Sequence, residues 1–337
     1  MPFRDVFGHQ RVVSLLSRAV ARGSVPPSLL FAGPEGVGKR RVAMALAETL
    51  NCLQPTTGDG LESDACGTCA ACRRIARGTH PDVIVLEPGD SGTIKIDPVR
   101  EIIDRAQYRP FEGRRRAVIV DHADALTDDA QSALLKILEE PPSGSVFLLV
   151  TSSPDALLST VRSRCPRLRF GPLSPGEIAD ALKRDHEYGD AEARAAAADA
   201  DGSLGRALEA EAADLTEARS TAQQWLTQAA RSGDLSTRVQ MAQSLFDKKS
   251  VPAVDRARLA ACLRALSSLL RDLGILSTRA DARMLANADL QGALERLAAA
   301  YDSTRSMRAF TAVDKALGAL ERNASPKIVA DWLVLQL

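Results

Sequence analysis

The chain has 337 residues, which is enough for two or three domains. Its 43 basic and 43 acidic residues balance, and aromatic residues make up only 4% of it. This composition argues against a protein that binds DNA by itself, because such proteins usually carry a basic excess or aromatic stacking surfaces. No apolar run approaches the length of a membrane helix and the N-terminus lacks the core of a signal peptide, so we expect a cytoplasmic protein without membrane contact.

The first prediction is that residues 3–22 form one amphipathic helix after a short entry, Val-Phe-Gly-His-Gln at 6–10. Apolar residues recur at helical spacing along it. They are Val12, Leu15, Leu16, Ala19 and Val20.

A glycine-rich segment at residues 29–41, Leu-Leu-Phe-Ala-Gly-Pro-Glu-Gly-Val-Gly-Lys-Arg-Arg, organises the first part of the chain. It predicts a short apolar strand, a loop and a helix, which is the context that a phosphate-binding P-loop requires. The backbone at Gly33, Gly36 and Gly38 can curl around a phosphate, and Lys39 adds a positive charge where the helix begins. The alternative, an ordinary glycine-rich turn, is disfavoured because the predicted strand, the glycine spacing and the predicted helix all agree with the P-loop pattern.

The residue after the lysine departs from a working P-loop. Ser or Thr normally stands there because its hydroxyl holds Mg²⁺, but this chain has Arg40. The loop is therefore predicted to bind phosphates, as ATP or ADP, and to support metal-assisted hydrolysis poorly.

Four of the six cysteines are clustered. Cys52 follows the P-loop helix, and Cys66, Cys69 and Cys72 form a Cys-x₂-Cys-x₂-Cys string. Four thiolates close a tetrahedral zinc site and leave no open position for chemistry. The polar segment between Cys52 and Cys66 would not pack without such a clip, so we predict structural Zn²⁺ in a module at about 52–72. Free buried cysteines and, less favoured, a catalytic zinc are the alternatives.

Strands and helices then alternate. Apolar runs at 82–86, 117–120 and 145–150 are expected to be buried strands of a parallel sheet, and residues 94–96 are a further candidate strand. One helix is expected to run from an Asp97 N-cap to Ala106, and another from Thr127 to the prolines at 141–142.

Polar residues follow two of these strands. An acidic residue at a strand end beside a P-loop normally holds Mg²⁺, and a glutamate normally follows it to polarise the attacking water. Asp121 fits the first role, with a simple turn or helix cap as the alternative, whereas His122 does not fit the second and is expected to be a surface or packing histidine. The Thr-Ser-Ser string at 151–153 fits γ-phosphate sensing and strand capping equally well.

The remainder of the chain has a helical pattern. Ser174 and Glu177 predict a capping box at the start of a first helix. Cys262 is expected in a helical core, and no catalytic motif stands out. Apolar stripes predict helices near 215–231, 236–247, 254–275, 289–301, 305–322 and 326–336, with breaks at Gly233, Pro252, Gly274 and Pro326.

Several strings, taken together and in order, resemble bacterial clamp-loader subunits of the AAA+ class, and more narrowly their delta-prime family in DNA polymerase III. The gamma and tau motor subunits keep Lys-Thr or Lys-Ser in the loop and Asp-Glu on the strand, whereas delta-prime subunits typically show degenerate motifs as here. The matching strings are residues 6–10, 33–39, the four cysteines, Asp121, Ala-Leu-Leu-Lys-Ile-Leu-Glu-Glu-Pro-Pro at 133–142, Ser-Arg-Cys at 163–165 and Gly-Ser-Leu-Gly-Arg-Ala-Leu at 202–208.

This resemblance implies an α/β AAA+ P-loop domain at 1–170, a helical lid at 171–212 and an all-α collar for oligomerisation at 213–337. It also implies a role for Arg164, which on its residues alone would be taken as a surface arginine. In the family the matching arginine is a finger that enters the ATP site of a neighbouring subunit. Arg206 matches a lid arginine that faces the subunit's own nucleotide, and without hydrolysis it is expected to be a relic.

The function implied is that of a fixed subunit of the DNA polymerase III clamp loader, with no efficient ATPase activity of its own. Its partners would be gamma/tau and delta subunits in a five-membered ring, the sliding clamp, and primed DNA reached through the assembly. Two alternatives remain: an active motor subunit with an unusual site, and a zinc-dependent protein that binds nucleic acid alone. Arg40 and His122 disfavour the first, and the balanced charge disfavours the second.

Overall fold

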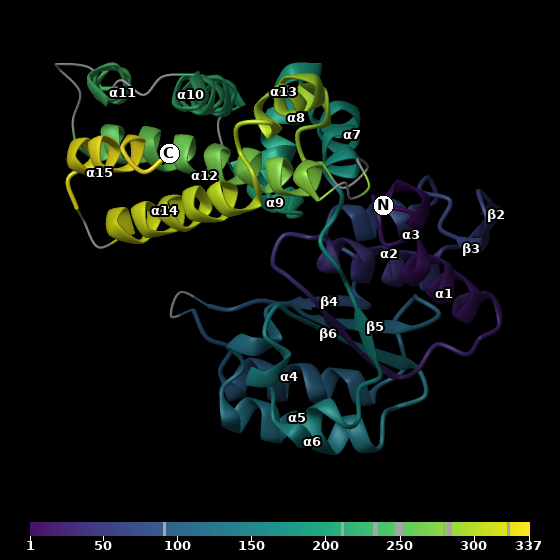
Figure 1. Cartoon of the computed structure of the whole chain (residues 1–337). Helices are drawn as coiled ribbons and strands as arrows, with labels where there is room; N and C mark the ends of the chain where they lie inside the picture. The colour runs from purple at the N-terminus through teal and green to yellow at the C-terminus, as the bar shows by residue number, and fades with distance from the viewer. Residues whose placement is uncertain are drawn as a thin grey trace. The chain divides into compact units, whose positions relative to one another are not determined.

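The computed structural model describes residues 1–89, 92–209, 212–231, 235–246, 252–278, 281, 285–321 and 324–337. The chain divides into two compact units, Met1–Leu173 and Ser174–Leu337 (Figure 1). This division falls close to the predicted boundary at 170. The second predicted boundary, at 212, coincides with the first residue of a long helix, and a separate lid and collar stay predictions.

The first unit is built on a five-stranded sheet in which every neighbouring pair is parallel. The strand order is β4-β5-β6-β1-β7. Its strands are β1 (Ser28–Ala32), β4 (Val83–Leu86), β5 (Arg116–Val120), β6 (Ser145–Thr151) and β7 (Arg167–Arg169). The three apolar runs predicted as strands are confirmed. Continuous apolar sequence suits them because helices cover both faces of a parallel sheet.

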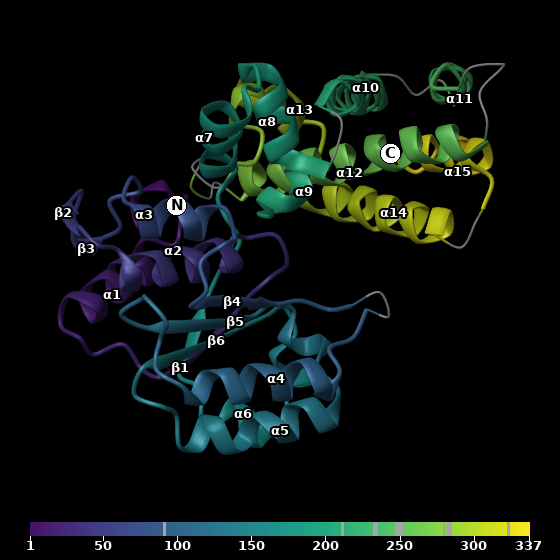
Figure 2. The same ribbon diagram turned by 180° about the vertical axis from the view of Figure 1, so that it is seen from behind.

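Alternate residues of each strand enter two separate cores. Leu29 and Phe31 of β1 pack with α1 (Gln10–Ala21) and α2 (Lys39–Asn51) on one face. Leu30 and Ala32 pack on the other face with α4 (Ile96–Gln107), α5 (Asp128–Glu139) and the short α6 (Ser159–Arg162). Figures 1 and 2 show these two helical layers on either side of the sheet. The predicted α/β fold is therefore confirmed.

The first helix is shorter than predicted. A 3₁₀ turn, η1 (Phe3–Asp5), precedes it, and α1 begins only at Gln10. Gly8 and His9 have φ angles of 64° and 53°. Because two consecutive left-handed residues interrupt a right-handed helix, residues 3–22 do not form one element.

The strand considered at 94–96 does not form. Ile94 makes only an isolated bridge with Leu126, and α4 begins at Ile96. The N-cap is Lys95, so the prediction of Asp97 as N-cap is wrong. Asp97 lies instead in the first turn, where a negative charge suits the helix dipole.

Other starts of helices are as predicted. Thr127 caps α5 by accepting a hydrogen bond from the backbone of Ala130. Ser174 and Glu177 form the predicted capping box at α7. Short 3₁₀ turns, η2 (Ala123–Ala125) and η3 (Pro154–Ala156), follow β5 and β6.

The second unit consists of helices around one apolar core, with α12 packed against α10, α13, α14 and α15. Cys262 and Trp225 lie fully buried in this core, as predicted for Cys262. No helix among the described residues is long and apolar enough to cross a membrane. The elements are α7 (Pro175–His186), α8 (Asp190–Asp199), α9 (Leu204–Glu209), α10 (Ala212–Arg231), α11 (Leu235–Gln243), α12 (Pro252–Ser277), η5 (Ala288–Leu290), α13 (Gln291–Ala298), α14 (Ser303–Glu321) and α15 (Pro326–Val334).

One predicted break in this unit is wrong. Helix α12 runs through Gly274 to Ser277, because buried Leu270 and Leu273 continue its apolar stripe and a single glycine costs a helix only about 1 kcal/mol. Pro252 and Pro326 each stand at the first residue of a helix, and the predicted break at Gly233 lies outside the described residues.

Gly33 closes the sheet against the segment after β7. A Cβ atom at this position would lie 2.2 Å from the carbonyl oxygen of Phe170 and 2.8 Å from its Cβ. The backbone of Phe170 donates a hydrogen bond to Ala32, so it cannot withdraw without breaking the sheet. Only glycine fits where β1 passes into the P-loop.

Replacement of Gly33 by alanine should therefore lower the free energy of unfolding by about 1–3 kcal/mol, as overpacking does elsewhere. Chemical denaturation of the full chain measures the change. Gly171→Ala is the matched control, since a Cβ there meets no atom within 4 Å. Equal stability of the two variants would contradict the close approach.

Candidate nucleotide pocket and metal centre

The predicted P-loop has the expected geometry. Strand β1 ends at Ala32, the loop occupies residues 33–38, and α2 begins at Lys39. Gly36 and Gly38 have φ angles of 70° and 101°, which L side chains rarely adopt. The three glycines thus serve two purposes: Gly33 allows a close approach, and the other two allow the loop to turn.

Lys39 is buried and bonded to its own loop. Its Nζ lies 2.8 Å from the carbonyl oxygen of Gly33 and 2.5 Å from that of Pro34. Burial lowers the pKa of Lys39, while the nearby carboxylates of Asp121 and Asp124 oppose that effect. Two of the three ammonium donors are therefore used by loop carbonyls.

Arg40 lies beside the carboxylate predicted to hold a metal. Its Nη1 lies 3.3 Å from Oδ2 of Asp121 and also pairs with Glu87, the residue after β4. Asp121 is only 6% exposed, and its Oδ1 accepts a hydrogen bond from the backbone of His122. The His122 side chain is exposed.

Two carboxylates of this site were missed by sequence reasoning. Glu87 follows β4 and Asp124 lies in the 3₁₀ turn η2, and no motif spacing marks either residue. Both line a pocket of about 450 Å³. The one sequence signal that could have identified Glu87 is its position directly after a predicted strand. The lining residues are Arg40, Glu87, Pro88, Gly92, Asp121, His122, Asp124 and Ala125.

The polar residues at the end of β6 form hydrogen bonds with Asp124. Thr151 Oγ1 donates to Asp124 Oδ1 at 2.6 Å, and the backbone of Ser152 donates to the same oxygen at 3.2 Å. These bonds are those expected of a strand cap. They leave the Thr151 hydroxyl proton engaged within the protein.

The string at 6–10 reaches the P-loop. His9 Nε2 lies 2.8 Å from the carbonyl oxygen of Val37, and the edge of its ring packs on Phe170. The segment before α1 therefore supports the loop directly.

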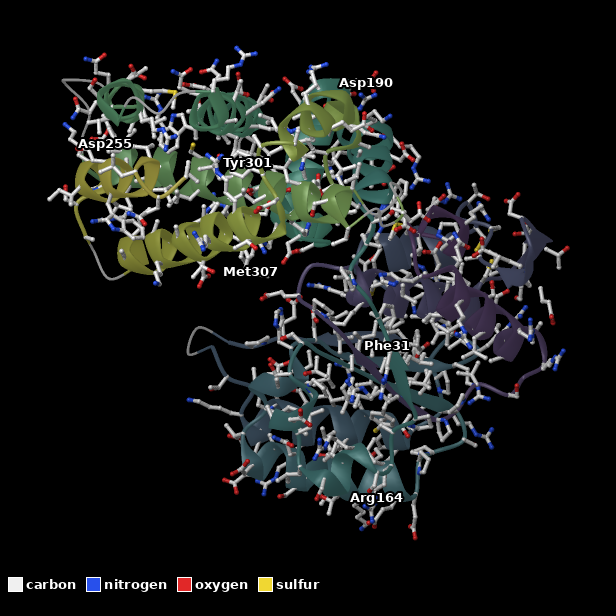
Figure 3. All side chains as sticks on the ribbon, viewed as in Figure 1. Phe31, Arg164, Asp190, Asp255, Tyr301 and Met307 are labelled. Carbon is white, nitrogen blue, oxygen red and sulfur yellow. The ribbon has the colours of Figure 1, made fainter. Side chains whose placement is uncertain are left out.

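Arg164 lies in the same unit but away from this pocket. Figure 3 shows it at the outer surface of the helical layer that contains α6, with Phe31 inside the sheet. Its Nη1 donates to the carbonyl oxygen of Thr160 at 2.8 Å and its Nη2 pairs with Glu139 at the end of α5. Its own carbonyl accepts a hydrogen bond from Ser28, and the next residue, Cys165, is buried.

Arg206 lies on α9 in the second unit and is exposed. Its backbone donates to the hydroxyl of Ser203. Its predicted relation to the nucleotide stays a prediction.

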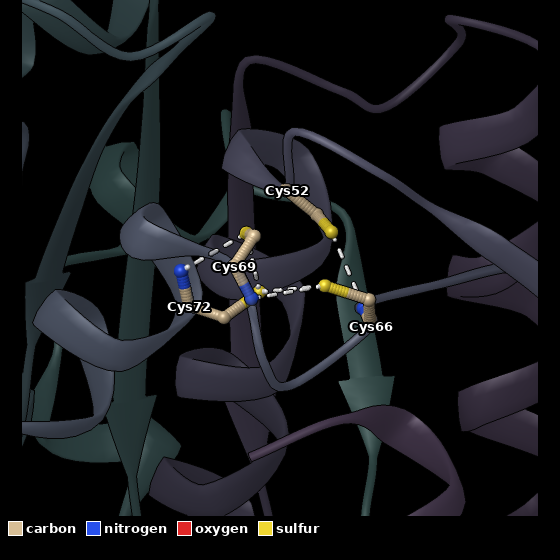
Figure 4. A group of neighbouring side chains, drawn as sticks. All are labelled: Cys52, Cys66, Cys69 and Cys72. Carbon is tan, nitrogen blue, oxygen red and sulfur yellow. Dashed lines mark hydrogen bonds between the residues drawn. The ribbon is translucent and has the colours of Figure 1, made fainter.

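The four clustered cysteines converge, as Figure 4 shows. Cys52 ends α2, Cys66 follows the hairpin β2 (Thr56–Gly58) and β3 (Leu61–Asp64), and Cys69 and Cys72 belong to the start of α3 (Ala70–Ala76). Their sulfur atoms all lie within 4.8 Å of one another. None of the four is in a disulfide.

This donor set fits a metal ion. Four thiolates at 2.3 Å from a tetrahedral centre would stand about 3.8 Å apart, and the Sγ of Cys72 lies 3.9 Å from that of Cys66 and 3.4 Å from that of Cys69. Burial acts to raise the pKa of Cys66, but hydrogen bonds from the backbone of Thr68 and Cys69 lower it to about 6. Such N–H···S bonds favour the thiolate form that a metal requires.

The cysteine module is joined to the N-terminal segment. The Asp64 carboxylate accepts hydrogen bonds from the backbone of Phe3 at 2.7 Å and from Arg4 Nη1 at 3.0 Å. Arg4 also donates to the carbonyl oxygens of Ala65 and Cys66. The module therefore holds the segment that leads to His9 and the P-loop.

Comparison with known proteins agrees with this layout. A family model described as "DNA polymerase III, delta subunit" matches residues 8–174, almost the whole first unit. The first unit of the chain thus resembles this family. The segment of the chain that matches the model contains the P-loop, the four cysteines, Asp121 and Arg164, whereas Arg206 lies beyond it.

Individual relatives include both gamma/tau and delta' subunits of DNA polymerase III. The gamma/tau subunit of Mycobacterium tuberculosis is 37% identical over 182 residues, which is 54% of this chain and 31% of that protein. The delta' subunit of Bacillus subtilis is 34% identical over 172 residues, which is 51% of this chain and 50% of that protein. The chain thus spans half or less of the length of these relatives.

A solved structure of a gamma subunit-related protein from Thermotoga maritima aligns with 95% of this chain and 96% of its own, at 18% identity and a TM-score of 0.43. That score is too low to compare sites or the arrangement of units.

Proposed function

We propose that this chain is a non-hydrolysing subunit of a DNA polymerase III clamp loader. The observation that carries this proposal is the ion pair between Arg40 and Asp121. Hydrolysis in a P-loop site uses a Ser or Thr hydroxyl and a strand-end aspartate on Mg²⁺, and a carboxylate that orients the attacking water. Here the hydroxyl is replaced by Arg40, the aspartate is already paired, and His122 stands in the place of the second carboxylate.

We further propose that Arg164 acts as an arginine finger in the ATP site of a neighbouring subunit. Its side chain is one-third exposed, and its backbone is held by Ser28 and by the burial of Cys165. The Glu139 carboxylate is about half exposed, so its ion pair with Arg164 is of the kind that is worth about 0–1 kcal/mol. The guanidinium could exchange this weak partner for a phosphate at little cost.

The proposed partners follow from the family and from the names of the relatives. They are gamma/tau and delta subunits in a five-membered ring, the sliding clamp, and primed DNA through the assembly. The helices of the second unit would supply a lid at 171–212 and a collar at 213–337, with Arg206 as a remnant of a lid arginine. A helical unit of this kind suits the proposed oligomerisation.

A motor subunit remains the competing function. It is favoured by the gamma/tau relative, whose identity of 37% exceeds the 34% of the delta' relative. A measurement of ATP turnover by the isolated chain distinguishes a motor subunit from a non-hydrolysing one.

For the four cysteines we propose structural Zn²⁺. The ion would complete its coordination with four thiolates and leave no position for a reacting water. Cys52 and Cys72 are fully buried, which supports a structural site.

The isolated chain should hydrolyse ATP no faster than its Lys39→Ala variant, because the groups that hold Mg²⁺ and orient water are replaced. A steady-state phosphate-release assay on the full chain measures this. Turnover that disappears in Lys39→Ala would move the protein to the motor class.

Arg164→Ala should leave the chain folded and able to assemble, yet slow ATP turnover by the reconstituted ring. At the ATP site that it serves, loss of a finger is worth about 10³–10⁵ in rate. Arg162→Ala is the matched control, since Arg162 ends α6 two residues before Arg164 and pairs at the surface with Asp155. Unchanged turnover at equal assembly, or an equal effect of both variants, would contradict the finger.

Protein purified without chelators should contain one zinc ion per chain, and Cys69→Ser should lose it. Metal analysis and native mass spectrometry measure the content, and circular dichroism reports the loss of order on chelation. Cys262→Ala is the control, since this cysteine lies in the core of the second unit and should leave the zinc content unchanged. Metal-free protein of native structure would refute the assignment.

A further inference from the structure

Arg40 joins three elements at the nucleotide pocket. It is the second residue of α2, and its guanidinium pairs with Glu87 just after β4 and with Asp121 just after β5. In the P-loop pattern the residue at this position faces the metal through a hydroxyl. The guanidinium therefore lies where a P-loop site places its divalent cation.

The residues present do not fit Mg²⁺. This ion needs near-octahedral oxygen ligands at 2.0–2.1 Å, but an arginine offers only N–H donors and no lone pair. Nη1 lies 3.3 Å from Asp121 Oδ2, the carboxylate oxygen that does not accept a hydrogen bond from the backbone of His122. A Mg²⁺ ion there would also be repelled by the permanent charge of the guanidinium, because like charges a few ångströms apart repel strongly in a partly buried site.

We propose that Arg40 is a built-in cation that replaces Mg²⁺ in this pocket. Any nucleoside di- or triphosphate that the pocket accepts is then bound in its metal-free form. The pocket also keeps its shape without a ligand, because Arg40 connects the start of α2 to the ends of β4 and β5.

The chemistry of the Arg40 side chain supports both metal-free nucleotide binding and a pocket that keeps its shape without a ligand. A guanidinium has five N–H donors in a planar fork, and it remains charged at every pH at which proteins are folded. Its side chain is about half exposed, so donors not used by Glu87 or Asp121 remain open toward the pocket. Phosphate oxygens are the acceptors that such a fork prefers. A bound Mg²⁺ ion can exchange with solvent, whereas this charge cannot leave.

The neighbouring Arg41 provides a matched control within the chain. It lies one residue further along α2 and places its guanidinium 6.0 Å from the centre of the Phe7 ring. Its Nε contacts the sulfur of Met1. Arg41→Thr therefore removes the same charge and introduces the same hydroxyl without altering the pairs of Glu87 and Asp121.

The experiment measures binding of the fluorescent nucleotide N-methylanthraniloyl-ADP to the full chain, in 5 mM Mg²⁺ (about the usual assay concentration) and in EDTA. The natural chain should bind the nucleotide with the same affinity in both buffers, and so should Arg41→Thr. Arg40→Thr restores the hydroxyl and frees Asp121, and it should bind about tenfold or more tightly in Mg²⁺ than in EDTA. Adding Asp121→Asn to Arg40→Thr should abolish that difference.

Binding by the natural chain that tightens about tenfold in Mg²⁺ would overturn the proposal, and so would Arg40→Thr behaving like the natural chain. If Arg40→Thr does not fold, Arg40→Gln removes the charge, keeps two N–H donors and frees Asp121, and its binding should also become tighter in Mg²⁺ than in EDTA. These assays use the isolated chain. The finger role of Arg164 is measured in the assembled ring, so either proposal can fail without the other.

Discussion

Five parallel strands end at one edge of the sheet, and this constraint places every part of the nucleotide pocket. The P-loop continues from β1, Glu87 follows β4, Asp121 follows β5, and Thr151 ends β6. In open parallel sheets, ligands bind outside the carboxyl ends of the strands. The apolar sequence of the strands fixes the sheet, and the sheet then brings together polar residues that are far apart in the chain.

Within that edge, several charged side chains already have protein partners. Lys39 bonds the loop carbonyls, Arg40 pairs with two carboxylates, and Asp124 accepts from Thr151. Charges that are paired inside a protein stabilise one arrangement and leave less to gain from a ligand. The cysteine module adds support from the other side through Asp64 and the N-terminal segment. Such a pocket is better suited to holding a fixed shape than to cycling between states.

The sequence predicted β1, β4, β5 and β6 and the convergence of the cysteines, because continuous apolar runs and Cys-x₂-Cys-x₂-Cys spacing are local signals. It did not predict β7, which is only three residues long and contains two arginines. It did not predict the limits of α1, since the left-handed pair Gly8–His9 has no apolar signature. Glu87 and Asp124 were also missed, because a single carboxylate in a loop or turn can be linked to a site only once the neighbouring strand is known. The partners of Arg40 required the sheet order, which brings the ends of β4 and β5 side by side.

Strand β1 also carries the two proposed sites at its opposite ends. Ser28 at its start bonds the carbonyl of Arg164, whereas Ala32 at its end leads into the P-loop, roughly 13 Å further along. A subunit that offers a charge at one end and receives one at the other associates head to tail, which generates rings or filaments rather than two-fold dimers. With Arg40 in place of the metal in its own pocket, such a subunit would supply an arginine to a neighbour but would not hydrolyse ATP itself. A ring that contains it would therefore have one position that differs from the others, whereas all positions in a ring of identical motors are equivalent.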